Sequence, residues 1–331
     1  MVRAMAMTTT SDGKVETLHA YAESDKIGPI GGKRSVFEDE AELRRTLVAE
    51  FQATANAARA AAAGVDRDPT AAVHEYRKAL RRARAVLALV ADALPRSERK
   101  ALARAVGEAR RALSAARDQA VAPDAVRSAK LPDDDQQTAE TVLAAVSEAA
   151  PATTEIKQLL AEGAARAAAQ VEALEAALPP TISWDVLAAG VRDIYGRARD
   201  ARKRAKHGRR AFHTWRRRSK ELTYQLELLA GYAGERVSEL ARDLDRVTDV
   251  QGPAVDLLML RQLVRTHGAA GDASERLADS IDDQLDDLIA EARRAGRDVF
   301  ARKPRRFARR LTKALRRDLA PTPVADDMAA D

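Results

Sequence analysis

Cysteine is absent from the 331 residues, which excludes disulfide bonds, thiolate zinc sites and catalysis by a thiol. Aromatic residues make up only 4% of the chain, so few large side chains are available to anchor a core. No uncharged run approaches the ~20 residues that a membrane span needs, and the N-terminus lacks the apolar stretch of a signal peptide. Alanine and arginine dominate instead. The composition therefore predicts an all-α protein that is soluble and cytoplasmic.

Two stretches predict amphipathic helices with strongly basic polar faces: VHEYRKALRRAR at residues 73–84 and FHTWRRRSKELTY at 212–224. At about 100° per residue, the basic side chains of each stretch share one face. The opposite faces hold Tyr76 in the first helix and Trp215 in the second, which we expect to anchor the core together with Phe212. The polar faces are expected to meet solvent, so alanine should replace their cations without loss of folding. They carry His74, Arg77, Lys78, Arg81 and Arg82 in the first helix and His213, Arg216, Arg217, Lys220 and Tyr224 in the second.

The charges are unevenly distributed along the chain. The 56 basic and 50 acidic residues give a net charge of only +6. Between Arg197 and Lys220, however, twelve basic residues stand against the single acid Asp200, and twelve more between Arg293 and Arg317 stand against Asp298 alone. Such clusters in a nearly neutral chain indicate a localised anionic partner.

Two halves are expected, separated by the diproline that follows Leu178. Helices are predicted near residues 38–63, 69–94, 97–118, 136–149 and 152–178 in the first half, with Pro123 as an interruption. In the second half they are predicted near 183–206, 209–231, 235–249, 253–267, 272–295 and 298–318. The resulting organisation is a disordered segment at 1–35, a first helical bundle at 36–180, a second at 181–319 and a disordered tail at 320–331.

The halves carry the signature of a duplication. His74 precedes Asp118 by 44 residues, and His213 precedes Asp256 by 43. Each aspartate begins an apolar stretch two predicted helices beyond the basic face. The joint agreement of histidine, basic face and aspartate predicts two copies of one antiparallel bundle.

These motifs resemble the CHAD family, the conserved histidine α-helical domain. The first copy reads V-H-x-x-R-x-x-x-R-R-x-R from Val73, and the second reads F-H-x-W-R-x-x-x-K from Phe212. The downstream pairs at Arg117-Asp118 and Asp256-Leu257 resemble the family's R-D and D-L stretches. The first copy departs from the family at Ala120, where a second acid is common, and residues 253–255 are less polar than in relatives.

The resemblance covers about residues 38–318 and implies two four-helix bundles related by a pseudo-twofold axis, with a basic channel between them. It further implies binding of inorganic polyphosphate, with other polyanions as related partners, and association with polyphosphate granules. Many relatives carry an adjoining triphosphate-processing domain with an E-x-E-x-K strand. That motif is missing here, so the chain resembles the standalone form.

Arginine forks bind phosphate oxygens in pairs, and Arg77 to Arg84 would span about 10 Å of helix, enough for several successive phosphates. Asp118 and Asp256 are expected to hold a basic side chain in position from behind. The predicted polyphosphate-binding residues are His74, Arg77, Lys78, Arg81, Arg82, Arg84, Lys203, Arg209, Arg210, His213, Arg216, Arg217, Lys220, Tyr224, Arg305, Arg306, Arg309 and Lys313.

Several alternatives stay open at this point. His74 and His213 could donate to phosphate, serve as structural hydrogen-bonding groups or bind a metal, although no H-E-x-x-H pairing occurs. The basic stretch from Ala301 to Arg317, with Phe307 and Leu311 at helical spacing, could lie on a membrane, bind nucleic acid or border the channel.

The preferred hypothesis is a non-enzymatic polyphosphate-binding protein without cofactor, metal or catalytic residues. No paired acid and base, nucleophile elbow or P-loop is visible. The alternatives are a nucleic-acid-binding architectural protein, for which few aromatics are available to stack on bases, and a phosphohydrolase, which would need a metal-binding acid cluster.

Overall fold

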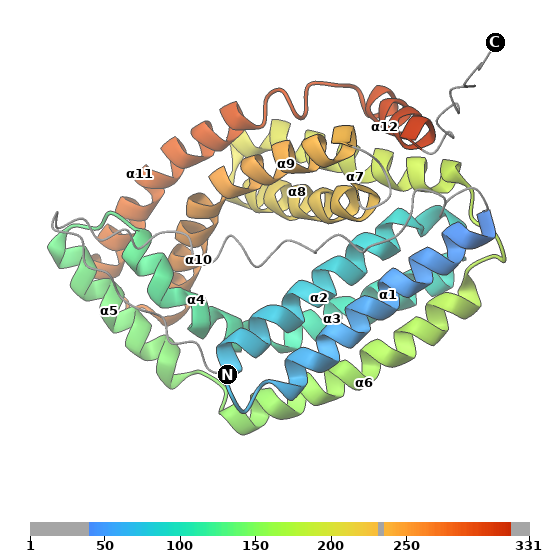
Figure 1. Ribbon diagram of the computed structural model, residues 1–331. Helices are drawn as coiled ribbons and strands as arrows, with labels where there is room; N and C mark the ends of the chain where they lie inside the picture. Colours follow the sequence, from blue (N-terminus) through green and yellow to red (C-terminus); the bar gives the residue numbers. More distant parts are fainter. Residues whose placement is uncertain (1–39, 231–234, 319–331) are drawn as a thin grey trace, which may run out of the picture. The chain divides into compact units, whose positions relative to one another are not determined.

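The computed structural model describes residues 40–230 and 235–318, and the segments expected to be disordered, 1–35 and 320–331, lie outside this part. The described residues contain α-helices and short 3₁₀ turns but no strand, which confirms the all-α class (Figure 1). The first half contains α1 (Glu40–Ala63), α2 (Pro69–Leu89), α3 (Arg96–Ala112), α4 (Ser114–Ser128), α5 (Asp133–Glu148) and α6 (Thr153–Ala177). The second half contains α7 (Trp184–Arg204), α8 (Arg209–Ala230), α9 (Glu235–Val250), α10 (Gly252–His267), α11 (Asp272–Ala295) and α12 (Pro304–Asp318).

The second six helices repeat the packing of the first six. Helix α1 packs on α2 and α6, α2 on α3, and α3 on α6; in the same way α7 packs on α8 and α12, α8 on α9, and α9 on α12. The remaining helices form a group that the halves share: α4 and α5 of the first half pack on α10 of the second, and α5 also packs on α11. All of the described residues belong to one compact unit. Each half thus contributes four helices to its own bundle and two to a shared group.

Helices α2 and α8 lie side by side and bring the two basic motifs together (Figure 1). The buried Gln225 of α8 donates its Nε2 hydrogen to the carbonyl of Ala85 in α2 at 3.2 Å. At the end of α2, Gly190 of α7 meets the backbone of Leu89, and a Cβ at that glycine would lie 2.3 Å from the Leu89 oxygen. Only a residue without a side chain allows this approach. The two halves are therefore joined through close backbone contacts at α2.

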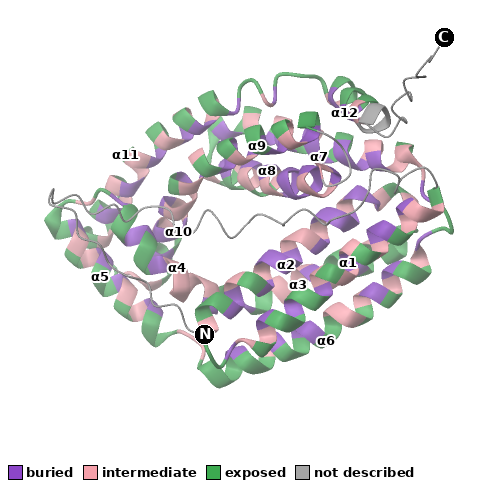
Figure 2. Ribbon diagram, in the orientation of Figure 1, coloured by how far each residue is buried: buried purple, intermediate pink, exposed green. Residues whose placement is uncertain are grey.

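The core consists mainly of small side chains with a few aromatic anchors. Tyr76, Phe212 and Trp215 are all fully buried, which confirms them as core residues. The rings of Phe212 and Trp215 meet edge to face, with centroids 5.7 Å apart. Buried residues alternate with exposed ones at helical spacing along the helices (Figure 2). Because alanine buries little apolar area, such a core gains its stability from many close helix contacts.

Two predicted helix boundaries in the first half are wrong. The sequence predicts one helix over 97–118, but α3 ends at Ala112 and α4 begins at Ser114 after a break at Leu113. Pro123 was expected to interrupt the chain, yet it lies inside α4. A proline removes one helical hydrogen bond, but Ala122 and Val126 on either side of Pro123 are buried in the core. Tertiary packing therefore carries the helix through the proline.

The predicted start of the last helix, at 298, is six residues earlier than its observed start at Pro304.

None of the described helices is both long enough and apolar enough to cross a membrane.

Candidate functional site

Arg77 and Arg216 hold equivalent places in the two halves, three residues after His74 and His213. The Arg77 Nη1 group donates to the carbonyls of Arg110 at 2.9 Å and Leu113 at 3.4 Å, at the end of α3. In the second half, Arg216 Nη1 donates to the carbonyl of Thr248 in the last turn of α9. The final carbonyls of a helix lack partners within the helix and carry partial negative charge. Each arginine therefore caps the helix that follows its own.

This capping role differs from the expected one. The sequence places Arg77 and Arg216 on solvent-facing sides, whereas the structure half-buries both between helices. Burial and, to a smaller extent, the neighbouring cations Arg117, Arg110 and Arg81 together lower the pKa of Arg77 to about 10, while Asp118 opposes them. Burial likewise lowers the pKa of Arg216. Both guanidinium groups thus stabilise the fold by capping a helix, and both add positive charge to their surroundings.

Around these two arginines lies a group of basic side chains close enough to lower one another's pKa values. Burial lowers the pKa of Arg110 and Arg217, and the positive charge of Arg84 acts on both. Arg110 and Arg117 were not among the predicted binding residues, because they follow the motif by more than 25 positions and lie on α3 and α4. We call the group the central cationic cluster; it comprises Arg77, Arg81, Arg84, Arg110, Arg117, His213, Arg216 and Arg217.

Three members of the central cationic cluster form no ion pair with any carboxylate in the described part of the chain. Within residues 40–230 and 235–318, no carboxylate lies at ion-pair distance from Arg81, Arg110 or Arg217. By contrast, Arg84 lies 3.6 Å from Glu221, which also pairs with a neighbouring arginine of α8. Like charges held together without counter-charges repel one another in the folded state. An anion that bound here would relieve this repulsion.

His213 sits at the surface of the cluster. Partial burial lowers its pKa below the ordinary value of 6.5, and the charges of Arg217, Arg117, Arg110 and Arg216 lower it further. The ring is therefore neutral near pH 7 in the free protein. A bound anion would offset the arginine charges and favour protonation of the ring, which would then donate from both nitrogens.

Asp118 and Asp256 are each the fifth residue of their helices, α4 and α10. Asp118 accepts from Arg117 at 2.8 Å and acts electrostatically on Arg77. Burial raises the pKa of Asp256, while the charges of Arg117 and Arg216 lower it. Each aspartate therefore acts electrostatically on the capping arginine of its own half, and the role of holding a basic side chain in position stays a prediction.

The other predicted residues of α2 and α8 are placed less favourably for a ligand. Lys78 is only 3% exposed, with Nζ 3.8 Å from the Glu75 carboxylate. Tyr224 is buried, and the guanidinium carbon of Arg82 lies 5.9 Å from its ring centroid, which permits a cation–π interaction. Lys220 pairs with Asp245 at 3.2 Å. His74 is half-buried on α2.

The predicted residues outside these two motifs are not brought into the cluster. Arg209 pairs with Asp282 and Asp286 of α11, and Lys203 lies 3.7 Å from Asp200. Arg210 borders an open hollow of about 370 Å³ at the α7–α8 junction. Helix α12 packs on α7 and α9 and not on α2 (Figure 1). The predicted residues on this helix are all exposed: Arg305, Arg306, Arg309 and Lys313.

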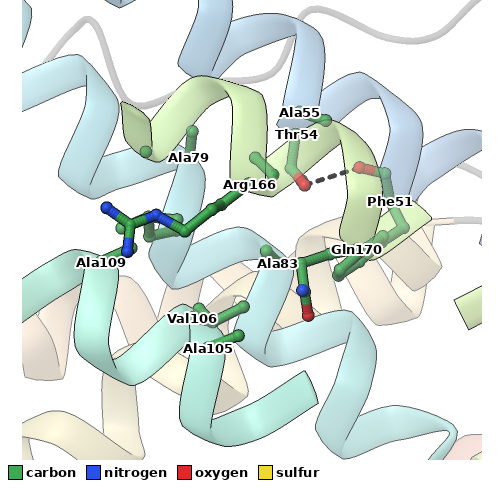
Figure 3. A pocket seen from close by; sticks show the side chains of 13 residues that line it. Phe51, Thr54, Ala55, Ala79, Ala83, Ala105, Val106, Ala109, Arg166 and Gln170 are labelled. Carbon is green, nitrogen blue, oxygen red and sulfur yellow. Dashed lines mark hydrogen bonds between the residues drawn. The ribbon is translucent and has the colours of Figure 1, made fainter. Parts of the chain in front are cut away.

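The enclosed hollow in the first bundle is too small for a ligand. It measures about 20 Å³, roughly the space of one water molecule. Alanines of α1, α2 and α3 line it, together with Arg166 and Gln170 of α6 (Figure 3). Across the described part of the chain, no group of three or more histidine and acidic side chains could hold a metal ion.

Comparison with known proteins identifies the class. The sequence profile of the CHAD domain matches residues 49–265. The chain therefore belongs to the CHAD family. It is also similar to the crystal structure of the CHAD domain from the plant Ricinus communis, with 18% sequence identity and a TM-score of 0.49 over 89% of this chain and 97% of that one. No curated protein matches the sequence.

Proposed function

We propose that this protein binds inorganic polyphosphate at the central cationic cluster, as a cytoplasmic protein that attaches to polyphosphate granules. The single observation that supports this most is that, among the described residues, no carboxylate lies at ion-pair distance from Arg81, Arg110 or Arg217, which lie on α2 and on two helices that pack against it, α3 and α8. Polyphosphate carries about one negative charge per phosphate on a thin, flexible chain. Such a chain can follow the exposed Arg217 to the half-buried Arg81 and Arg110, which a wider polyanion would reach less easily.

The two halves contribute unequally to this proposed site. Arg110 and Arg117 of the first half have Thr248 and Val255 as their sequence counterparts in the second. No carboxylate of the described residues lies at ion-pair distance from Arg81, whereas its counterpart Lys220 is paired with Asp245. The positive charge without a carboxylate at ion-pair distance therefore lies on α2 and α3 of the first half, with Arg217 added from α8 of the second.

We further propose that binding occurs without chemical conversion of the polymer. The aspartates of the site lie next to arginines, which fits a positioning role better than proton transfer. Incubation of labelled polyphosphate with the protein, with and without magnesium, should release no phosphate. Release that a point mutation in the protein abolishes would overturn this part of the proposal.

The binding experiment uses the double variant Arg81→Gln/Arg217→Gln. Its matched control is Arg104→Gln/Arg246→Gln, which removes the same charge from exposed side chains paired with Glu108 and Asp243. Polyphosphate of several chain lengths is titrated at a series of salt concentrations. The cluster variant should bind more weakly, with the slope of log K against log salt reduced by up to about 1.4, or ~0.7 per lost contact as for single strands.

The control variant should bind almost as well as the unmodified protein. Affinity should also rise with chain length and fall with salt, since each contact releases counterions. Equal losses in the two variants, or equal affinity for orthophosphate and long polymer, would refute the central cationic cluster as the polyphosphate site.

A further inference from the structure

A second basic surface lies on α12 and the turn before it. Its side chains are all exposed, and among the described residues none has a carboxylate at ion-pair distance. The apolar side of the helix is buried, with Phe307 stacked on Tyr195 of α7 at a centroid distance of 3.8 Å. We call this surface the α12 cationic face; it comprises Arg302, Lys303, Arg305, Arg306, Arg309, Arg310 and Lys313.

The fold itself does not require this charge. Helix α6 holds the equivalent place in the first half, packed on α1 and α3 as α12 packs on α7 and α9. The exposed side of α6 carries four glutamates, and both of its basic residues are paired, Lys157 with Asp66 at 2.6 Å and Arg166 with Glu162 at 3.0 Å. The same position in the bundle is thus held by the acidic helix α6 in the first half. In the second half it is held by α12, whose exposed cations have no carboxylate at ion-pair distance among the described residues. The difference points to a ligand of α12.

We propose that the α12 cationic face binds the phosphate backbone of a nucleic-acid duplex, without reading its sequence, at a site separate from the central cationic cluster. The five cations within α12 cover an arc of about 140° and a length of about 12 Å. A duplex presents one charge per ~1.7 Å, and its major groove is about 12 Å wide, comparable with the diameter of a helix. No aromatic side chain is exposed on this surface to stack on bases. We therefore expect its cations to contact phosphates, which position a protein on a duplex without reading the sequence.

Two other polyanions fit this face less well. A helix that lies on a membrane buries its apolar side in the lipid interface, but Phe307, Ala308 and Leu311 of α12 are already buried within the protein. Polyphosphate is flexible and would lose conformational freedom on a convex helix. A duplex is rigid before it binds, so it loses less.

The test measures binding of a duplex of random sequence to the full-length protein at about 50 to 200 mM salt. The variant replaces Arg305, Arg306, Arg309 and Arg310 with glutamine, which retains good helix propensity. We expect the variant to bind the duplex on the order of tenfold or more weakly, with the salt slope reduced by up to about 3.6. Its matched control should bind like the unmodified protein. It replaces four exposed arginines that are paired with acids by glutamine, namely Arg104, Arg127, Arg242 and Arg246.

Short polyphosphate and vesicles with anionic lipid are tested beside the duplex. The α12 variant should keep its affinity for short polyphosphate, and Arg81→Gln/Arg217→Gln should keep its affinity for the duplex. These crossed results separate the two sites, so either can fail without the other. The proposal is overturned if the α12 variant binds the duplex as tightly as its control does. It is also overturned if the α12 variant loses affinity for the vesicles but not for the duplex. Retained helical circular dichroism in both variants excludes unfolding as the cause.

Discussion

Arg77 and Arg81 provide a test of which arginines of α2 serve the fold. Both lie in the middle of α2, and each substitution by alanine removes one positive charge from the central cationic cluster. Arg77 donates to two carbonyls at the end of α3, whereas the Nε group of Arg81 is buried without a partner among the described residues. We expect a clear loss of stability from Arg77→Ala and little loss or a gain from Arg81→Ala, although the change in charge is the same.

The magnitude for Arg77 follows from its contacts. A hydrogen bond from a charged group contributes about 1.5–3 kcal/mol, and a cation near a helix C-terminus about 0.3–1 kcal/mol. Loss of repulsion from Arg110, Arg117 and Arg81 offsets part of this. We expect Arg77→Ala to lower the free energy of unfolding by about 2 kcal/mol. Arg81→Ala loses no such bond, so it should change that free energy by less than about 0.5 kcal/mol or raise it.

Urea denaturation followed by far-ultraviolet circular dichroism measures both variants at low and high salt. Salt should weaken any gain from Arg81→Ala, since screening reduces the repulsion that the substitution relieves. It should change the loss from Arg77→Ala less, because that loss comes from direct hydrogen bonds. Equal midpoints for the two variants, or a larger loss for Arg81→Ala, would refute the capping role of Arg77.

Two further predictions concern packing and pH. A Cβ at Gly163 would lie 1.9 Å from the buried Tyr76 hydroxyl, so Gly163→Ala should lower the melting temperature and the free energy of unfolding by about 1–3 kcal/mol. Gly107→Ala meets only the tip of the Arg111 side chain and should be neutral or stabilising, so equal losses would contradict the assigned contact. Because the pKa of His213 is lowered on folding, the folded state binds fewer protons, and the free energy of unfolding should fall as pH drops below the ordinary value of 6.5. In the same window polyphosphate affinity should rise, and an unchanged pH dependence of both quantities in His213→Gln would exclude this histidine as the titrating group.

The sequence predicts most of the fold because its helical signals are local. The spacing of apolar residues, the cap at Asp68 with Pro69 behind it, and the glycines between helices depend on a few neighbouring positions. The side chain of Asp68 indeed accepts from the amide of Ala71 at 2.9 Å. The break at Leu113 and the passage of α4 through Pro123 could not be predicted in this way, since both depend on contacts with distant helices.

The candidate site was predictable only in part, for the same reason. A helical wheel groups Arg77 with Lys78 and Arg81, because it shows one helix at a time. The neighbouring helices then separate them: Arg77 reaches the end of α3, Lys78 is buried, and Arg81 has no carboxylate at ion-pair distance among the residues that the structure describes. Arg110 lies 33 residues after Arg77 in the chain, and no pattern within α2 could indicate that it joins the same cluster.

Comparison of the two halves separates the residues that the fold needs from those that give the site its charge. The carbonyls that receive Arg77 and Arg216 belong to Arg110 and Thr248, each two residues before the end of its helix. A backbone carbonyl accepts a hydrogen bond whatever side chain its residue carries, so the cap works in both halves although one side chain is basic and the other neutral. The charge of the Arg110 side chain is therefore dispensable for capping. Its presence in one half alone is explained by the anion that we propose the site binds.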